Sequence, residues 1–538
     1  LHYPLRRQRQ MCIRDSFYMP RLEKQKKFYV TTPIYYVNDV PHIGHAYTTV
    51  AADVLARYYR TLLGPAKVYF LTGTDEHGAK IAQAAEKNKM TPKEFVDQKA
   101  AVFQMAWDSL DISYNDFIRT TEERHEKIVI DFWEKLKTAK TPKKNPAIYE
   151  AEYEGLYCVG CESFKTEDEL VDGQCPDHKI KCELVKEKNW FLRLSDFGDK
   201  LKDLIEAGDF QVLPLERKNE ILGLIKTGSK DVAISRQNVK WGIPVPFDKG
   251  QTTYVWIDAL SNYISALGGP KGKLYKKFWP ADVHLMAKDI LKFHALIWPA
   301  MLLALKLPLP KKVFSHGFFT IDGQKMSKTI GNVIDPNELV SKYGSDATRY
   351  LLLSQFGFGT DGDFSKERLD SIYNSALANE LGNLVSRVLA MAEKYYDSIV
   401  PKYNVDSDKF FEFDIKTDWN KYDFLMQNLK FDEALNIAWE DIRRCNAYID
   451  KNKPWELAAN NDDEILPDVI FNLLETIRQI AWMLLPFMPQ TSDKILTQLG
   501  FDPAVEKEKK IEILRKWPGI KLGQKINKGA SLFPRLNQ

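Results

Sequence analysis

The pattern of apolar and polar positions divides the chain into parts with different periods. Between residues 26 and about 140, short runs of β-forming residues alternate with segments whose apolar residues recur with the period of a helix. This alternation predicts an α/β fold with a doubly wound parallel sheet, in which ligands bind at the carboxyl ends of the strands. The expected strands are 28–32, 67–72 and 115–118, and the expected helices start at 43 and cover parts of 79–109 and 121–138.

Beyond residue 370 the pattern becomes helical to about 500, which predicts an α-helical bundle. Between the two parts, the string TPKKNPAIY is typical of a linker, and the hundred or so residues after it carry short strands and loops before the sheet resumes near 250. The tail from about 503 is rich in lysine and weakly patterned. The apolar repeats of the bundle are 372–394, 421–451 and 466–498.

Residues 1–22 show no clear periodicity and do not start with methionine. Four arginines precede the first acidic residue, but the stretch lacks the serine content and amphipathic repeat of a transit peptide. We therefore expect an unstructured or non-native extension, with Met19 as the true start.

Composition indicates a globular protein of several domains. The 538 residues exceed what one core usually organises, and a hydrophobic fraction of 44% with a mean hydropathy of -0.36 is ordinary for a soluble protein. No run approaches the roughly 18 uncharged apolar residues that span a bilayer, so no membrane association is expected. The net charge of +3 means that a nucleic-acid partner would have to meet local basic patches.

Four of the six cysteines lie between residues 158 and 182. Cys158 and Cys161 form one pair, and Cys175 and His178 form a second, which is the spacing of a tetrahedral zinc site with two knuckles. Buried thiols without metal would explain one cysteine but not four ligands so spaced. Cys182 is the alternative to His178 as the fourth ligand. The pattern predicts one structural Zn²⁺ and a reducing, cytoplasmic location.

Two further segments indicate phosphate binding. The stretch FYVTTPIYYVNDVPHIGH places His42 and His45 at the start of a helix, whose exposed amides attract phosphate, and Gly44 permits close approach. The string KMSKT places Lys325 and Lys328 on either side of Ser327 in a glycine-bounded loop suited to a polyphosphate. Taken singly, each segment is also compatible with an ordinary polar surface.

Together, HIGH and KMSKT resemble the paired signatures of class I aminoacyl-tRNA synthetases. Within that class the chain resembles the methionyl-tRNA synthetases over about residues 26 to 500. The matching strings are TTPIYYVNDVPHIGHAY, LTGTDEHG, YCVGC, SRxxxxWGIPVP, YVWIDAL, KDILKFHALIWPA, KMSKT, DGDFS, ELGNLVSR and KPW.

The resemblance implies activation of L-methionine with ATP, accompanied by Mg²⁺, and transfer of the methionyl group to tRNA(Met). The catalytic residues would be His42, His45, Lys325 and Lys328. The ATP-binding residues would be His42, Gly44, His45, Asp289, Lys325, Ser327 and Lys328. The methionine-binding residues would be Ile34, Tyr36, Asp75, Trp256, Ala259, Tyr263, Phe293 and His294. The anticodon would be bound by Asn383, Arg387, Pro454 and Trp455, and Zn²⁺ by Cys158, Cys161, Cys175 and His178.

Each of these residue types also has a plain structural explanation. Asp75 follows a strand and could cap a helix, and the stripe of Trp256, Ala259 and Tyr263 at helical spacing is usual in a core. Asn383 and Arg387 could be a surface pair, and Trp455 a packing residue. Two positions depart from the family pattern: Ala287 stands where glycine is usual, and Thr329 replaces the last serine of KMSKS.

The resemblance implies a Rossmann-like catalytic domain interrupted by a connective peptide and followed by an anticodon-binding bundle. The expected divisions are 1–22 (extension), 23–140 and 249–320 (catalytic halves), 141–248 (insert with zinc knuckle), 321–369 (stem-contact region) and 370–538 (anticodon-binding bundle and tail). No appended β-barrel is expected, and a monomer is preferred.

The alternatives are a class I synthetase for another amino acid and, as a different class of protein, a non-catalytic tRNA-binding relative. A synthetase for leucine, valine or isoleucine would carry a much larger editing insert, and a cysteine enzyme would place its zinc in the amino-acid pocket. A non-catalytic tRNA-binding relative would bind ATP without forming an adenylate, and both intact phosphate signatures argue against it.

Overall fold

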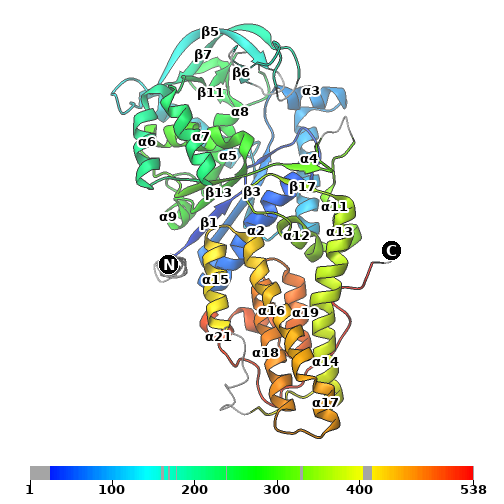
Figure 1. Ribbon diagram of the computed structural model, residues 1–538. Coiled ribbons are helices and arrows are strands. Elements are labelled where there is room, and N and C mark those ends of the chain that lie inside the picture. Colours follow the sequence, from blue (N-terminus) through cyan, green and yellow to red (C-terminus); the bar gives the residue numbers. More distant parts are fainter. Residues whose placement is uncertain are drawn as a thin grey trace, which may run out of the picture.

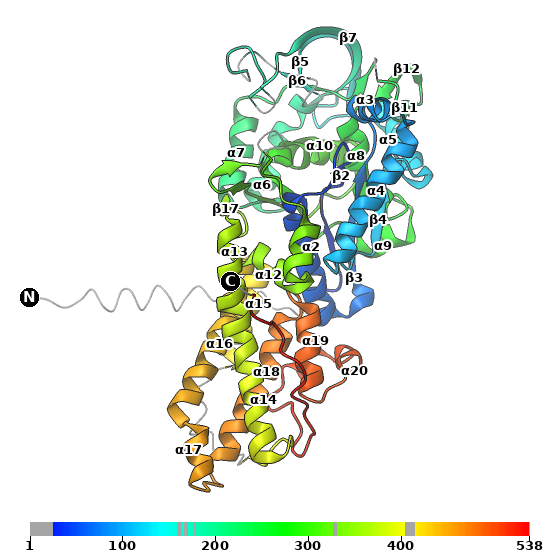
Figure 2. The ribbon, with the colours of Figure 1, turned by 90° about the vertical axis from the view of Figure 1, so that its right-hand side faces the viewer.

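The computed structural model describes residues 25–158, 163–165, 167, 170–176, 179–237, 239–326, 331–403 and 415–536. The molecule is elongated, with an α/β part at one end and a bundle of long helices at the other (Figure 1). The view turned by 90° shows the two parts joined near the middle of the molecule (Figure 2). The predicted order of a parallel sheet followed by a helical part is confirmed.

A central sheet of seven parallel strands organises the α/β part. β1 (Phe28–Thr31) pairs with β3 (Val68–Asp75) on one side and with β13 (Val283–Ala287) on the other. Every residue of β1 and β3 is buried, as expected for a parallel sheet covered on both faces. The remaining strands are β2 (Tyr35–Tyr36), β4 (Asp116–Arg119), β14 (Lys312–His316) and β8 (Gln211–Leu213).

β8 lies at the edge of this sheet and pairs in parallel with β14. It falls within residues 141–248, which the sequence assigned to the insert, so the predicted insert is too long. The strand has only three residues, Gln-Val-Leu, which is too short to show a period, and its partner lies far along the chain. The helices on either side of β8 in the chain are α6 (Gly198–Ala207) and α7 (Leu215–Lys226).

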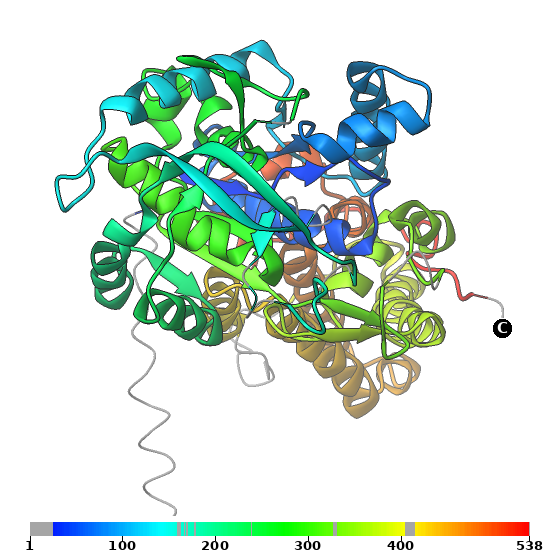
Figure 3. The same cartoon turned by 90° about the horizontal axis from the view of Figure 1, so that it is seen from above.

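A long antiparallel ribbon stands over the α/β part, as Figures 1 and 3 show. Its strands are β5 (Ile148–Cys158) and β7 (Glu183–Leu192), which pair from Ile148 opposite Leu192 to Tyr157 opposite Glu183. β6 (Ser163–Lys165) and β9 (Val232–Ala233) complete a sheet of four strands. A second small sheet contains β10 (Ser235–Arg236), β11 (Pro244–Val245) and β12 (Asp248–Thr253).

Helix α2 (Ile43–Leu63) follows the β1 and β2 segment and is buried along most of its length. Its apolar and small residues face both the sheet and the helical part, which explains a helix with few exposed positions. The other helices of the α/β part are α3 (Ala79–Lys87), α4 (Pro92–Ser109), α5 (Glu123–Thr138), α8 (Val255–Ser265), α9 (Lys273–Phe278) and α10 (Trp298–Ala304).

A small sheet and two helices connect the α/β part to the bundle. β15 (Phe319–Ile321) pairs with β16 (Gln324–Lys325) and with β17 (Gly362–Phe364). The connecting helices are α11 (Pro336–Tyr343) and α12 (Ser345–Leu353). These elements lie in the region expected to link the two halves.

The bundle is built on the three predicted apolar repeats, which are largely helical. The second repeat is divided into two helices by residues 428–430, and the third by residues 485–488. Its apolar residues share one continuous core with α2 and part of the sheet. Within the described residues, no helix is both long and apolar enough to cross a bilayer. The helices are α13 (Lys366–Ile372), α14 (Asn383–Tyr396), α15 (Ile415–Gln427), α16 (Phe431–Asn452), α17 (Pro454–Ala459), α18 (Leu466–Leu484), α19 (Pro489–Gln498), α20 (Pro503–Lys507) and α21 (Ile511–Leu514), with a π-helical segment Tyr373–Gly382.

A buried ion pair fastens α2 to the bundle. Arg349 of α12 lies 2.7 Å from the Asp53 carboxylate of α2, and both side chains are excluded from solvent. The same guanidinium donates to the main-chain oxygens of Pro486 and Phe487, which precede α19, and of Leu110. One side chain therefore ties together α2, the end of α4 and the bundle.

A second polar contact joins the far end of α2 to the bundle. The Tyr58 hydroxyl donates to the Asp423 carboxylate of α15 at 2.9 Å. Arg515 holds the same carboxylate through two hydrogen bonds of 2.6 and 2.8 Å. These contacts place the bundle and α2 in one packed unit.

Candidate active site

The HIGH segment forms the start of α2 through a reciprocal cap. His42 is the N-cap residue, and its Nδ1 accepts a hydrogen bond from the Gly44 amide at 3.1 Å. In return, the His42 amide donates to Nδ1 of His45 at 3.2 Å. The two rings stack with centroids 3.8 Å apart. The histidines thus replace the Ser/Thr and Glu of a usual capping box, and their spacing of three residues suits that role.

The caps determine which ring nitrogen carries the proton. A backbone N–H can only donate, so Nδ1 of His42 and of His45 must be acceptors. Burial lowers the pKa of His42 to about 4 and places that of His45 well below its ordinary value, so both rings are neutral at pH 7. Each neutral ring therefore carries its proton on Nε2, a donor suited to a phosphate oxygen.

The described ends of the KMSKT segment lie against the start of α2. A Cβ placed on Gly44 would come within 2.9 Å of His42 Cε1 and 3.5 Å of Met326 Cε, so the methionine lies directly over the glycine. After the segment, the Ile334 oxygen accepts from the Ile43 amide at 3.1 Å. The Lys325 main chain belongs to β16, whereas Ser327, Lys328 and Thr329 lie outside the described residues.

His316 connects α2 to the strand that leads into the KMSKT segment, and the sequence interpretation missed it. Its Nε2 lies 2.6 Å from the Thr48 hydroxyl of α2, and its Nδ1 lies 2.7 Å from the Gly317 oxygen. Because Nδ1 must donate to that oxygen, Nε2 accepts from Thr48. Burial lowers the pKa of His316 to about 4, which keeps this arrangement neutral. The sequence feature that could have pointed to His316 is its position directly before Gly317, ahead of the KMSKT segment.

The residues predicted to bind methionine come from β2 and the residue before it, from β3, from α8 and from the π-helical segment Phe293–Ile297. Tyr36 of β2 lies opposite Asp75 of β3 in the parallel register. The Val37 amide donates to the main-chain oxygen of Asp75 at 3.2 Å. Trp256 of α8 stacks on Phe293 with centroids 3.8 Å apart and an interplanar angle of 7°. Ile34, Trp256 and Phe293 are partly buried against one apolar core, and Ala259 is buried.

Tyr263 and His294 form the buried end of this group. The His294 Nδ1 lies 3.0 Å from the Ile290 oxygen and must donate to it, so Nε2 accepts from the Tyr263 hydroxyl at 2.7 Å. Burial lowers the pKa of His294 to about 4 and raises that of Tyr263. Both side chains are held in fixed, neutral states. Asp289, predicted near ATP, is exposed just after Ala287, the last residue of β13.

The residues predicted to bind the anticodon meet at the far end of the bundle. Asn383 is exposed at the first position of α14, and Arg387 follows one turn later. The Arg387 guanidinium lies 5.5 Å from the ring centroid of Trp455, which is 43% exposed, and 3.2 Å from Asp450. Pro454 is buried and begins α17. An exposed ring beside a guanidinium suits the binding of an unstacked base.

Comparison with known proteins identifies the family. A family model for class I tRNA synthetases (M) matches residues 28–183 and 178–389, and a model for the anticodon-binding domain of tRNA ligases matches 409–531. The methionine--tRNA ligase of Caldanaerobacter subterraneus subsp. tengcongensis is 47% identical over 524 residues, which are 95% of this chain and 79% of the relative. The chain belongs to the methionyl-tRNA synthetase family.

Other members support the same assignment. The methionine--tRNA ligase of Thermotoga maritima is 43% identical over 523 residues, covering 95% of this chain and 80% of the relative. The structure of Mycobacterium tuberculosis methionyl-tRNA synthetase in complex with methionyl-adenylate superposes with a TM-score of 0.89 at 35% identity, covering 95% of this chain and all of that one. The chain is therefore an aminoacyl-tRNA ligase with the fold of that family.

Two of the four predicted zinc ligands, Cys158 and Cys175, lie within the described residues. Cys158 and Cys175 are buried in one small cluster together with Cys182. Cys161 and His178 lie outside the described residues. Among the residues that are described, no group of three or more His, Cys, Asp or Glu side chains is arranged to hold a metal ion. The zinc site therefore stays a prediction.

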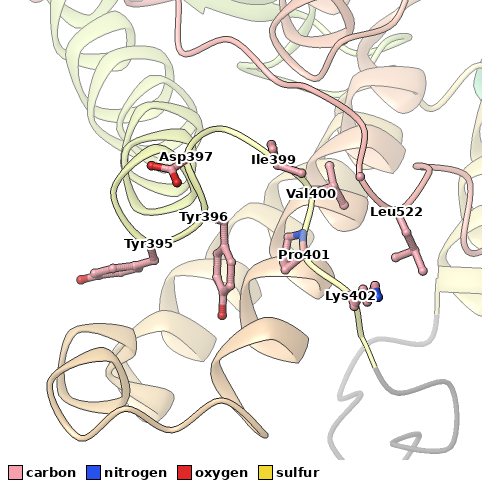
Figure 4. A pocket seen from close by; sticks show the side chains of 9 residues that line it. Tyr395, Tyr396, Asp397, Ile399, Val400, Pro401, Lys402 and Leu522 are labelled. Carbon is pink, nitrogen blue, oxygen red and sulfur yellow. The ribbon is translucent and has the colours of Figure 1, made fainter.

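An open hollow of about 500 Å³ lies at the end of α14, away from the HIGH segment (Figure 4). Tyr395, Tyr396 and Lys402 line it together with apolar residues of the following loop and Leu522. Burial and the nearby carboxylates of Asp463 and Asp468 raise the pKa of Tyr396 to about 12. These acidic neighbours oppose an anionic ligand, so we assign the hollow no part in ATP or tRNA binding.

Proposed function

We propose that the chain converts L-methionine and ATP to methionyl-adenylate and pyrophosphate, and then transfers the methionyl group to the terminal adenosine of tRNA(Met) for translation initiation and elongation. In the first step the methionine carboxylate attacks the α-phosphorus, and the bond to pyrophosphate breaks. In the second, a ribose hydroxyl attacks the acyl carbon and AMP leaves. Neither step needs a protein nucleophile, so positioning and charge stabilisation carry the catalysis.

The neutral rings of His42 and His45 at the start of α2, where Met326 lies over Gly44, are the observation that carries this proposal. Their Nε2–H groups would donate to the phosphates from one side, and Lys325 and Lys328 would approach from the KMSKT segment. Ser327, Gly44 and Asp289 would complete the ATP site. Magnesium would accompany ATP and be held chiefly by its phosphates.

The amino-acid pocket proposed here suits a thioether. Aromatic walls from Trp256 and Phe293 give sulfur contacts of about 0.3 to 1.5 kcal/mol each. Asp75 would hold the α-ammonium and so fix the carboxylate for attack, and Tyr36 would favour sulfur over a plain alkyl chain. Ile34, Ala259, Tyr263 and His294 would shape the remaining wall.

Exchange between ATP and pyrophosphate, measured with each of the twenty amino acids and without tRNA, tests this function directly. Exchange that depends on methionine alone would support both the reaction and its specificity. Folded protein that gave no exchange with any amino acid would contradict the proposal and favour a relative that only binds tRNA.

Trp455 provides a separate test of tRNA recognition. Replacing Trp455 with alanine is expected to weaken tRNA charging by about one to two orders of magnitude, because stacking contributes about 1 to 3 kcal/mol per base. Exchange without tRNA should stay at the wild-type rate, since the ring lies at the far end of the bundle. Steady-state charging and exchange assays on one preparation measure both. An equal loss in the two assays would make Trp455 a packing residue. The more exposed Leu522, changed to alanine, is the matched control.

For the insert we propose one structural Zn²⁺ held by Cys158, Cys161, Cys175 and His178. The burial of Cys158 and Cys175 in one cluster supports this, because converging thiols suit the metal. When bound, the ion would hold the tip of the insert, which would place the acceptor end of tRNA. Cys182 shares the cluster and is the alternative fourth ligand.

Zinc content separates these two ligand sets. Purified His178→Ala is expected to lose most of its zinc, because three ligands remain, whereas Cys182→Ser should retain about one ion per chain. Elemental analysis after dialysis gives the stoichiometry. The reverse result would assign Cys182 as the fourth ligand, and no zinc in the wild type would refute the site.

We further propose that the chain works as a cytoplasmic monomer. Its mass in solution would test the monomeric state.

A further inference from the structure

Each residue of the turn after Asp75, Glu76 to Gly78, is hydrogen-bonded to a segment distant in the sequence. The Glu76 carboxylate accepts two hydrogen bonds from the Arg119 guanidinium, at 2.6 and 3.0 Å. The main-chain oxygen of Glu76 accepts from the Trp241 indole at 2.6 Å. The Gly78 amide donates to the Trp241 oxygen at 3.0 Å. Between them, the His77 Nδ1 lies 2.7 Å from the carboxylate of Asp258. The turn that presents Asp75 is therefore held rigidly on several sides.

Asp258 is the point at which this turn meets α8. It lies in the first turn of α8, which begins without a side-chain cap, and its own side chain is buried. One carboxylate oxygen binds His77 and the other lies 2.6 Å from Nε2 of His125 on α5. The His125 Nδ1 reaches the Ser265 hydroxyl at 2.7 Å, two turns further along α8. Asp258 therefore fixes α8 against both α5 and the turn after Asp75.

Charge strengthens this arrangement. Burial alone would raise the pKa of Asp258. The two imidazoles, chiefly that of His77, outweigh burial and lower this pKa. Burial likewise opposes the charged form of His77, but Asp258 outweighs it and raises the pKa of that imidazole. The bond between His77 and Asp258 thus has the character of a buried, charge-assisted pair.

The adjacent residues of α8 form one wall of the methionine pocket. Ala259 follows Asp258 directly, Trp256 lies two residues before it, and Trp256 stacks on Phe293. The bond between Asp258 and His77 therefore joins this wall to the turn that carries Asp75. In the proposed pocket, this bond connects the turn that would hold the α-ammonium to the wall that would hold the thioether.

We infer that Asp258 is a positioning residue for amino-acid selection: through His77 and His125 it fixes the gap between Asp75 and the aromatic wall, and so determines the side-chain length that the pocket accepts. This inference rests on the methionine pocket proposed above. Asp258 itself touches no reacting atom. Its effect belongs to methionine and its analogues, whereas the ATP site on α2 lies on other elements and should not respond.

Asp258→Asn tests the inference in the exchange assay with methionine and with ethionine, which is longer by one methylene. A shift in position of about 1 Å can alter rates by about 100-fold, so we expect the KM for methionine to rise about tenfold. The preference for methionine over ethionine, in kcat/KM, should fall at least about fivefold, because one methylene is worth about 10- to 200-fold in a fitted pocket. The KM for ATP should stay within about twofold.

Two further variants keep the test decisive if Asp258→Asn folds poorly. His77→Asn keeps an amide donor at the position of Nδ1 and should retain most of the preference, whereas His77→Leu should lose it. Asp196→Asn is the matched control, because that buried carboxylate also joins two segments, through Thr141 at 2.8 Å and Asn145 at 2.9 Å, but away from the pocket.

The outcomes distinguish the inference from the proposed function. An active, folded Asp258→Asn with an unchanged preference, or with equal changes in the KM for methionine and for ATP, would overturn the inference alone. Equal behaviour of His77→Asn and His77→Leu would do the same. A wild-type enzyme without methionine-dependent exchange would overturn the proposed function, and this inference with it.

Discussion

Changing His45 to asparagine is expected to lower the rate of adenylate formation by about 100- to 1,000-fold, the usual effect of removing one preorganised donor to developing charge. An asparagine oxygen at this position can replace Nδ1 and keep the bond from the His42 amide, so α2 should still start normally. The Nε2–H donor, however, is lost. Single-turnover formation of methionyl-adenylate measures the effect, and the KM for methionine should change little.

His45→Gln is the matched comparison for this variant. Glutamine is a usual residue at this position of a capping box, so its side-chain oxygen can accept from the His42 amide and α2 should still start normally. The longer side chain also brings an amide N–H nearer to the position of Nε2, so we expect this variant to retain more of the rate than His45→Asn, with a free energy of unfolding within about 1 kcal/mol of it. A faster asparagine variant would contradict a role for the Nε2–H donor.

Replacing Arg349 with methionine is expected to reduce the free energy of unfolding by about 3 to 5 kcal/mol, because breaking a buried ion pair leaves the other charge poorly compensated. Arg57 would still lie 2.7 Å from Asp53, but the main-chain oxygens of Leu110, Pro486 and Phe487 would each lose a donor. Urea denaturation followed by circular dichroism measures the loss.

A surface ion pair gives the control for this experiment. Lys93 and Asp97 lie 2.5 Å apart on α4 with about half of each side chain exposed, so Lys93→Ala should change stability by no more than about 0.5 kcal/mol. If Arg349→Met had the same free energy of unfolding as this control, the buried ion pair would make no net contribution to stability. Arg349→Lys should be intermediate, since it keeps the charge but not the planar fork that reaches all four oxygens.

Local patterns predicted the elements well where they were long. The helix that starts at Ile43, the strand that includes Phe70 and the three repeats of the bundle all follow from period and composition. β8 was missed because three residues carry no period, and because its place is decided by pairing with β14. Its assignment to the insert followed from its place in the sequence, whereas the sheet is assembled from distant segments.

The site shows the same limit at the level of single residues. Motifs located His42, His45 and the wall of Trp256 and Phe293, and the contact between Met326 and Gly44 agrees with reading HIGH and KMSKT as a pair. The hydrogen-bonded group around Asp258 could not be found that way, because its members lie on segments separated by the insert. A buried carboxylate in a mostly apolar helix was the only local sign of it.

The attachment of α2 to the bundle also defines a fixed span within the molecule. The helix that presents His42 is fastened through Asp53 to α12 and through Tyr58 to α15, and these pack in one core with the helices that carry Arg387 and Trp455. Moving one end relative to the other would expose buried charges. These contacts hold the two ends at a set separation, and an RNA that engaged both proposed sites would have to match it.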